Sequence, residues 1–149
     1  MTLRVGNCML AVLVLFGTLQ AQNPDTMAVR KVITQFHQAL ETRNLKAIES
    51  LVATDLVVFE NGHRNDGWAD FRDNHLIPEM QEPASMSQWE IVRVAASDSM
   101  AWGYTKETIS PKKGESSGAN FLLWSVYIME KRQNEWKIVV LDWSIRKLR

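Results

Sequence analysis

Residues 119–147 read ANFLLWSVYIMEKRQNEWKIVVLDWSIRK. This stretch contains two long segments, Ala119–Lys131 and Glu135–Lys147, that are rich in the β-branched and aromatic residues favoured in strands. The break between them, Gln133-Asn134, is typical of a tight turn. The two segments therefore predict a hairpin of long antiparallel strands.

Two more strand-like segments precede this hairpin, near Met86–Ala95 and Met100–Ile109. Turn-forming residues, Ser97-Asp98-Ser99 and Pro111 to Gly118, separate them from each other and from the hairpin. Consecutive strands with such short connections pair most simply as antiparallel neighbours. We therefore expect a four-stranded meander in the second half of the chain.

The first half has helical periodicity instead. One amphipathic stripe comprises Val29, Val32, Ile33, Phe36 and Leu40. Asp25 or Thr26 is a suitable N-cap for this helix. A second, shorter helix is predicted after Asn44, through Leu45, Ile48, Leu51 and Val52.

A strand and a third helix complete the elements. The strand Leu56–Glu60 stops at Asn61-Gly62, a dipeptide that accepts the positive φ values of a tight turn. Asp66 can cap a helix through His75, and Pro78 is expected to end it. Helices first and a sheet afterwards make an α+β domain.

This element order resembles the nuclear transport factor 2-like superfamily, also called SnoaL-like. The local signatures are Val58-Phe59-Glu60-Asn61-Gly62, His75-Leu76 and the closing segment Trp136 to Ser144. Members of the superfamily with a similar closing segment often carry His at the position of Asp142. The resemblance covers roughly Asp25 to Lys147. It implies a cone-shaped fold, with N-terminal helices packed on a strongly curved antiparallel β-sheet and a pocket between them. The superfamily places many activities on this scaffold, so the resemblance does not fix a reaction.

The N-terminus has the features of a secretory signal peptide: a basic Arg4, an apolar run Met9 to Phe16, and small and polar residues from Gly17 to Ala21. We expect residues 1–21 to be removed, leaving residues 22–149 as one periplasmic or secreted domain. The apolar run is shorter than the ~20 residues of a membrane-spanning helix, so no membrane association is expected after cleavage. Cleavage would also remove Cys8, the one cysteine, and with it any thiol chemistry.

Charge excludes some partners. The chain has 17 basic and 17 acidic side chains. Because no basic excess is present, neither nucleic acid nor an anionic membrane surface is an expected partner.

Asp142 is the first candidate for acid–base chemistry. Strict alternation along the last strand puts it on one face with Trp136, Ile138, Val140 and Ser144. A carboxylate on such an apolar face is costly unless its pKa shifts or it has a partner. The alternatives are that this face is the outer one, or that Asp142 pairs with Arg93 or Lys106.

His75 is the second candidate, because the resemblance puts the pocket mouth near the end of its helix and imidazole exchanges protons near neutral pH. Glu60 can join it as a ligand-binding residue. Glu60, His75 and Asp142 together would form a mixed N/O set for a divalent metal, although no metal-binding spacing such as HExxH is present. We therefore expect no cofactor. His37 and His63 are interpreted as structural or surface residues.

Aromatic residues give a further signal. Trp102, Tyr104 and Trp124 come from predicted strands and Trp68 from the third helix. If these rings line the concave face, they offer a stacking surface for a flat organic ligand. The alternative is that they fill the core.

Three functions follow from these observations. The first is an exported pocket protein that binds a small, largely apolar organic ligand. The second is a cofactor-free lyase or isomerase that uses Asp142 and His75 as acid and base. The third is an interaction module, since long strands with apolar residues on both faces also predict a homodimer. The directions in which Asp142, His75 and Glu60 point discriminate between these functions.

Overall fold

A computed structural model of the 149-residue chain describes residues 23–82, 86–110 and 119–148. The expected signal peptide, its cleavage site and the polar segment 112–118 lie outside these residues. None of the described helices is long and apolar enough to cross a bilayer.

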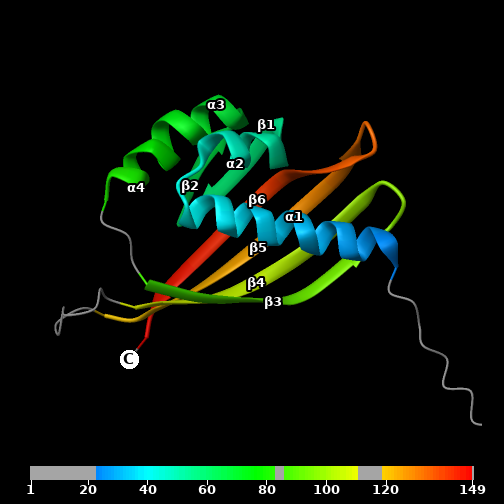
Figure 1. The fold of residues 1–149 in the computed structure, drawn as a ribbon. Coiled ribbons are helices and arrows are strands. Elements are labelled where there is room, and N and C mark those ends of the chain that lie inside the picture. The colour runs from blue at the N-terminus through cyan, green and yellow to red at the C-terminus, as the bar shows by residue number, and fades with distance from the viewer. Residues whose placement is uncertain (1–22, 83–85, 111–118, 149) are drawn as a thin grey trace, which may run out of the picture.

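The described chain forms a helical layer against a curved six-stranded sheet (Figure 1). The helical segments are α1 (Pro24–Glu41), α2 (Leu45–Leu51), α3 (Gly67–Phe71), the π-helix η1 (Arg72–Leu76) and α4 (Ile77–Gln81). The strands are β1 (Val52–Glu60), β2 (His63–Asp66), β3 (Met86–Ala96), β4 (Met100–Ser110), β5 (Phe121–Arg132) and β6 (Glu135–Lys147). This confirms the α+β prediction.

Helix α1 lies across the concave side of the sheet (Figure 1). Its stripe of Val29, Ile33 and Phe36 is fully buried. The cap prediction was wrong by two or three residues, because the N-cap is Asn23, whose side chain accepts a hydrogen bond from the Asp25 amide, and Pro24 occupies the first turn. Proline suits that position since its missing N–H would have no helical partner there.

The sheet has the strand order β2-β1-β6-β5-β4-β3. The four long strands form the predicted antiparallel meander, and Gln133 and Asn134 adopt positive φ at the β5–β6 turn. Strand β1 turns at Asn61-Gly62 into the short strand β2, also as expected for that dipeptide. However, β1 pairs with β6 in parallel, so the sheet is mixed rather than wholly antiparallel.

The third helix extends beyond its predicted end. It passes through η1 and continues past Pro78 to Gln81. Proline normally stops a helix because it lacks an N–H for the carbonyl four residues earlier. Here Pro78 stands in the first turn of α4, directly after the π-helical segment, where that hydrogen bond is not required.

A β-bulge in β6 decides which side chains face the helices. Ile128 pairs with Val140 and Met129 with Ile138, so Val139 is an extra residue in the ladder. One inserted residue reverses the alternation beyond it. Consequently Trp136 and Ile138 are buried before the bulge, and Leu141 and Trp143 are buried after it.

Candidate functional site

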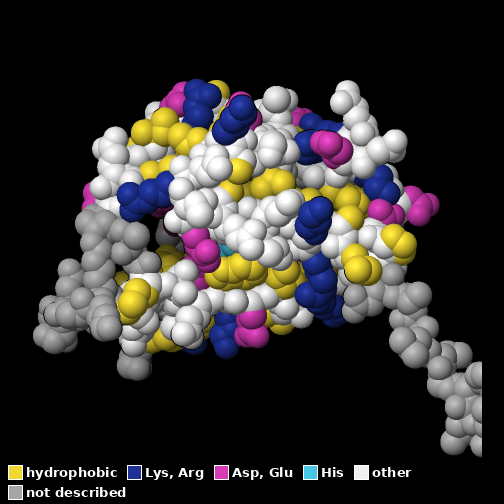
Figure 2. Space-filling view, in the orientation of Figure 1, with side chains coloured by type: hydrophobic (Ala, Val, Ile, Leu, Met, Phe, Trp, Pro, Cys, Tyr) yellow, Lys and Arg dark blue, Asp and Glu magenta, His cyan; other side chains and the backbone are white. Residues whose placement is uncertain are grey.

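A cavity of about 710 Å³ lies between the helices and the sheet. Its sheet wall includes Leu123, Ser125 and Trp143, and its helical wall includes Leu40 and Leu76. Figure 2 shows the surface hollowed between the helical layer above and the sheet below, with acidic side chains at the edge of the hollow. The cavity therefore has both apolar and polar groups in its walls, and solvent can reach it.

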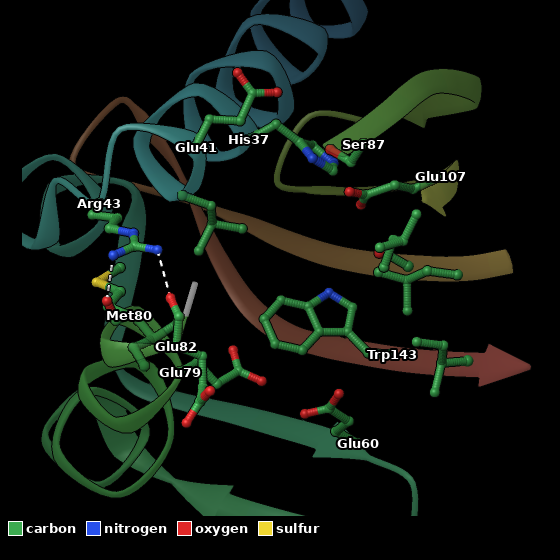
Figure 3. Close-up of a pocket in the computed structure, with 16 residues that line it drawn as sticks. His37, Glu41, Arg43, Glu60, Glu79, Met80, Glu82, Ser87, Glu107 and Trp143 are labelled. Atoms are coloured by element: carbon green, nitrogen blue, oxygen red, sulfur yellow. Dashed lines mark hydrogen bonds between the residues drawn. The ribbon is translucent and has the colours of Figure 1, made fainter. Parts of the chain in front are cut away.

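The charged groups around this cavity are mostly acidic. Five of its lining residues are glutamates: Glu41, Glu60, Glu79, Glu82 and Glu107. The one cation among the lining residues, Arg43, donates hydrogen bonds from its guanidinium to the backbone carbonyls of Met80 and Glu82, at 2.6 and 2.7 Å (Figure 3). These carboxylates produce a negative potential that favours a positively charged occupant.

Two of these glutamates, Glu60 and Glu79, form a cluster with His75, which is not itself among the lining residues. Glu60 ends β1, His75 lies in η1, and Glu79 follows one helical turn later in α4. His75 Nε2 is 2.9 Å from Glu60 Oε2 and 3.4 Å from Glu79 Oε1. Burial lowers the pKa of His75, but the nearby carboxylates of Glu60 and Glu79 outweigh that effect and raise its pKa to about 9. Without another cation in the cluster, the imidazole is therefore protonated at neutral pH.

Aromatic neighbours fix the orientation of the His75 ring. Its centroid lies 5.1 Å from that of Phe71 and 5.5 Å from that of Trp143. Nε2 itself is buried, and no acceptor among the described residues lies along its N–H direction as a hydrogen bond requires. The 2.9 Å contact with Glu60 is therefore close in distance but poorly directed.

A second polar group extends from the cavity into the core. His37, on α1, is stacked on Trp89 with the ring centroids 4.1 Å apart, and its Nε2 shares a 2.9 Å hydrogen bond with the hydroxyl of Tyr127. Burial lowers the pKa of His37 to about 4, so its imidazole is neutral at physiological pH. Burial also raises the pKa of the Tyr127 phenol and of the Glu107 carboxyl. The neutral imidazole of His37 and the phenol of Tyr127 thus form an uncharged hydrogen-bonded pair beside the cavity.

The structure brings two of the predicted site residues together, Glu60 and His75, and separates them from Asp142. Asp142 follows the bulge at Val139 and so lies on the outer face, paired with Val126 in β5. The expectation that it forms the pocket floor is wrong. The alternative of an ion pair with Arg93 or Lys106 is not found either, since Asp142 forms no ion pair among the described residues. Arg93 instead lies over the ring of Trp102.

The predicted aromatic lining is also outside the cavity. Trp102 and Trp124 are 41% and 37% exposed on the outer face, and Tyr104 lies between them. Trp68 is buried in the core, where its Nε1 donates to Glu49. Alternation identifies residues that share a face, but it does not tell which face is concave.

Sequence reasoning missed several lining residues. Trp143 was assigned to the opposite face because the bulge is invisible in the sequence. Glu79 could have been predicted from the sequence, because it lies four residues after His75, and side chains at that spacing on a helix are neighbours. His37 was interpreted as structural, yet it lines the cavity. His63 is exposed on β2, in agreement with its interpretation as a surface residue.

Comparison with known proteins places this architecture in a family. Residues 29–146 match the SnoaL-like domain. The chain belongs to the SnoaL-like family. No curated protein matches this SnoaL-like chain.

Solved structures share the fold of this SnoaL-like chain at low sequence identity. An NTF2-like protein of unknown function from Pseudomonas putida KT2440 has a TM-score of 0.69 and 18% identity over 80% of this chain and 85% of its own. A putative ketosteroid isomerase from Shewanella frigidimarina NCIMB 400 has a TM-score of 0.69 and 18% identity, over 78% and 94% of the two chains. A putative calcium/calmodulin-dependent protein kinase type II association domain from Thiobacillus denitrificans ATCC 25259 has a TM-score of 0.65 and 14% identity, over 80% and 94%. These similarities show the fold and leave the ligand open.

Proposed function

We propose that this SnoaL-like protein binds a small organic ligand with an apolar body and a positively charged group. The observation that carries the proposal is the combination of apolar side chains in both walls of the cavity with five lining glutamates. The one cation among the lining residues, Arg43, is already hydrogen-bonded to backbone carbonyls. The cavity volume of about 710 Å³ is in the usual range for sites that bind small organic ligands. The acidic lining changes the expectation of a largely apolar ligand.

Charge-matched probes test this proposal. Tryptamine, 3-ethylindole and indole-3-propionate share one ring system and carry a positive, zero and negative charge. Titration calorimetry should show tryptamine bound at least tenfold more tightly than indole-3-propionate. A tenfold difference in affinity corresponds to about 1.4 kcal/mol. This is less than the interaction energy of about 4 kcal/mol between two unit charges about 4 Å apart near a protein surface.

A variant on the helical wall separates charge from shape. Glu41→Gln removes one carboxylate while leaving an oxygen that can accept the hydrogen bond from Trp89 Nε1. It should weaken tryptamine binding and leave 3-ethylindole binding unchanged. The matched control is Glu135→Gln, at the exposed start of β6. Equal affinity for the three indoles would contradict the proposal.

A second candidate function is proton transfer, as in a cofactor-free isomerase or lyase. It is favoured by Glu60, whose carboxylate lies beside His75, while Glu107 lies on the other side of the Trp143 ring (Figure 3). Glu60 would then replace Asp142 as the base, and the half-buried Glu107 carboxyl, whose pKa burial raises, would donate to the developing oxyanion from its protonated form. One structural neighbour is named as a putative ketosteroid isomerase.

The test of this second function is isomerisation of a Δ5-3-ketosteroid in EDTA, followed by the absorbance of the conjugated enone. Turnover that disappears in Glu60→Gln supports it. Turnover that survives in Glu60→Gln, or is absent from the wild type, excludes it for this substrate class.

We also propose that the protein is exported before it acts. The basis is the N-terminal pattern of charge, apolar run and small residues. Intact-mass analysis of the exported protein should give a chain that begins near Gln22. A soluble product that retains residues 1–21 would contradict export.

A further inference from the structure

The three ligand atoms of Glu60, His75 and Glu79 are arranged as a cation site would require. They all lie within 4.8 Å of one another. The Nε2–oxygen distances are 2.9 and 3.4 Å. Two ligands each about 2.1 Å from one ion lie about 3.0 Å apart in octahedral and about 3.4 Å apart in tetrahedral geometry. The observed spacings match the edges of such a coordination shell.

The orientation of His75 is a second, independent observation. Its Nε2 is buried and lies next to two carboxylates, but no acceptor lies along its N–H direction among the described residues. A hydrogen-bonded ion pair would direct the N–H at one oxygen. Metal coordination instead directs the nitrogen lone pair at an ion placed beside the carboxylate oxygens.

The backbone supplies a third observation. His75 lies in the π-helix η1, an uncommon local geometry that is frequent at functional sites. Phe71 and Trp143 hold the imidazole ring in place. Both carboxylates also line the cavity, and in Figure 3 Glu60 and Glu79 point into it.

We propose that Glu60, His75 and Glu79 bind one divalent transition-metal ion at the wall of the cavity. One imidazole and two carboxylates suit Mn²⁺, Fe²⁺ or Zn²⁺ better than Ca²⁺ or Mg²⁺, which prefer oxygen ligands alone. The two carboxylates balance the charge of the ion. Three protein ligands leave at least one coordination position for water or a ligand, and the cavity wall is where that position opens.

The sequence predicts no metal, and the alternative set that it offers is Glu60, His75 and Asp142; in the site proposed here Glu79 takes the place of Asp142. This site shares Glu60 and Glu79 with the acidic lining on which the proposed binding of an organic cation rests, but that binding is tested at Glu41. The two proposals can therefore fail separately.

Titration calorimetry with MnCl₂ and with ZnCl₂, on EDTA-treated and dialysed protein, tests the metal site. We expect one ion per chain. Glu79→Gln should weaken binding at least tenfold and fold normally, because this side chain is 57% exposed on α4. His75→Gln should weaken binding by at least as much.

The matched control is Asp73→Asn. Asp73 is a half-exposed carboxylate on the same π-helix, paired with Arg72 and outside the cluster. This variant should bind both ions as the wild type does. Three results would overturn the proposal: no binding by the wild type at millimolar metal, binding that Glu79→Gln leaves intact, or an equal loss in Asp73→Asn.

Discussion

The buried imidazole of His37 should make the protein less stable as the pH falls below neutrality. Only 5% of His37 is exposed, and burial lowers its pKa to about 4 in the folded protein. The pKa of an unfolded histidine is about 6.5. Between these two values the unfolded chain binds more protons than the folded chain, so stability is lost as the pH decreases.

The size of the effect follows from the same two pKa values. Each pKa unit corresponds to about 1.4 kcal/mol, so His37 accounts for a loss of about 3 kcal/mol between pH 7 and values below pH 4. At pH 5 the expected loss is about 2 kcal/mol. His75 contributes in another window, because its folded pKa of about 9 is raised and its contribution is lost above pH 6.5.

Urea unfolding followed by tryptophan fluorescence, at pH values from 4.5 to 7.5, measures this loss. His37→Gln removes the titrating group and keeps a polar atom for the Tyr127 hydroxyl. The free energy of unfolding of this variant should be lower than that of the wild type at pH 7 but should change less with pH. His63→Gln, at an exposed position on β2, is the control and should follow the wild type. Parallel pH curves for wild type and His37→Gln would refute the reasoning.

Three other predictions concern the sheet. Gly103→Ala should lower the free energy of unfolding in urea by about 1–3 kcal/mol, because the added Cβ would lie 2.9 Å from Ile33 Cδ1 and 3.2 Å from the Arg93 carbonyl oxygen. An unchanged free energy of unfolding would mean that α1 can move away from the sheet without loss of stability. Asp142→Asn should change the free energy of unfolding by no more than about 0.5 kcal/mol at pH 7, as expected for an outer-face residue, whereas a loss of several kcal/mol would indicate a buried ionic partner. We also propose a homodimer through the outer face, so light scattering should report a dimer that Trp124→Lys converts to monomer; a monomeric wild type at micromolar concentration would exclude it.

Local sequence determined most of the elements. The four long strands begin and end within a few residues of their predicted bounds. Asn61-Gly62 and Gln133-Asn134 form the turns because these residues tolerate positive φ. Helix α1 follows from the 3.6-residue spacing of its apolar stripe. Each of these features depends on interactions between residues close together in the chain, so the sequence alone specifies them.

Tertiary structure decided the site. The extra residue Val139 exists only relative to the partner strand β5, and it reverses the faces of Asp142 and Trp143. The parallel pairing of β1 with β6 brings Glu60 opposite Trp143 although they are far apart in the chain. The cluster of Glu60 with His75 and Glu79 depends on that packing. A one-residue change of register moves every later side chain to the other face, which is why sequence alternation found the strands and misplaced the carboxylate.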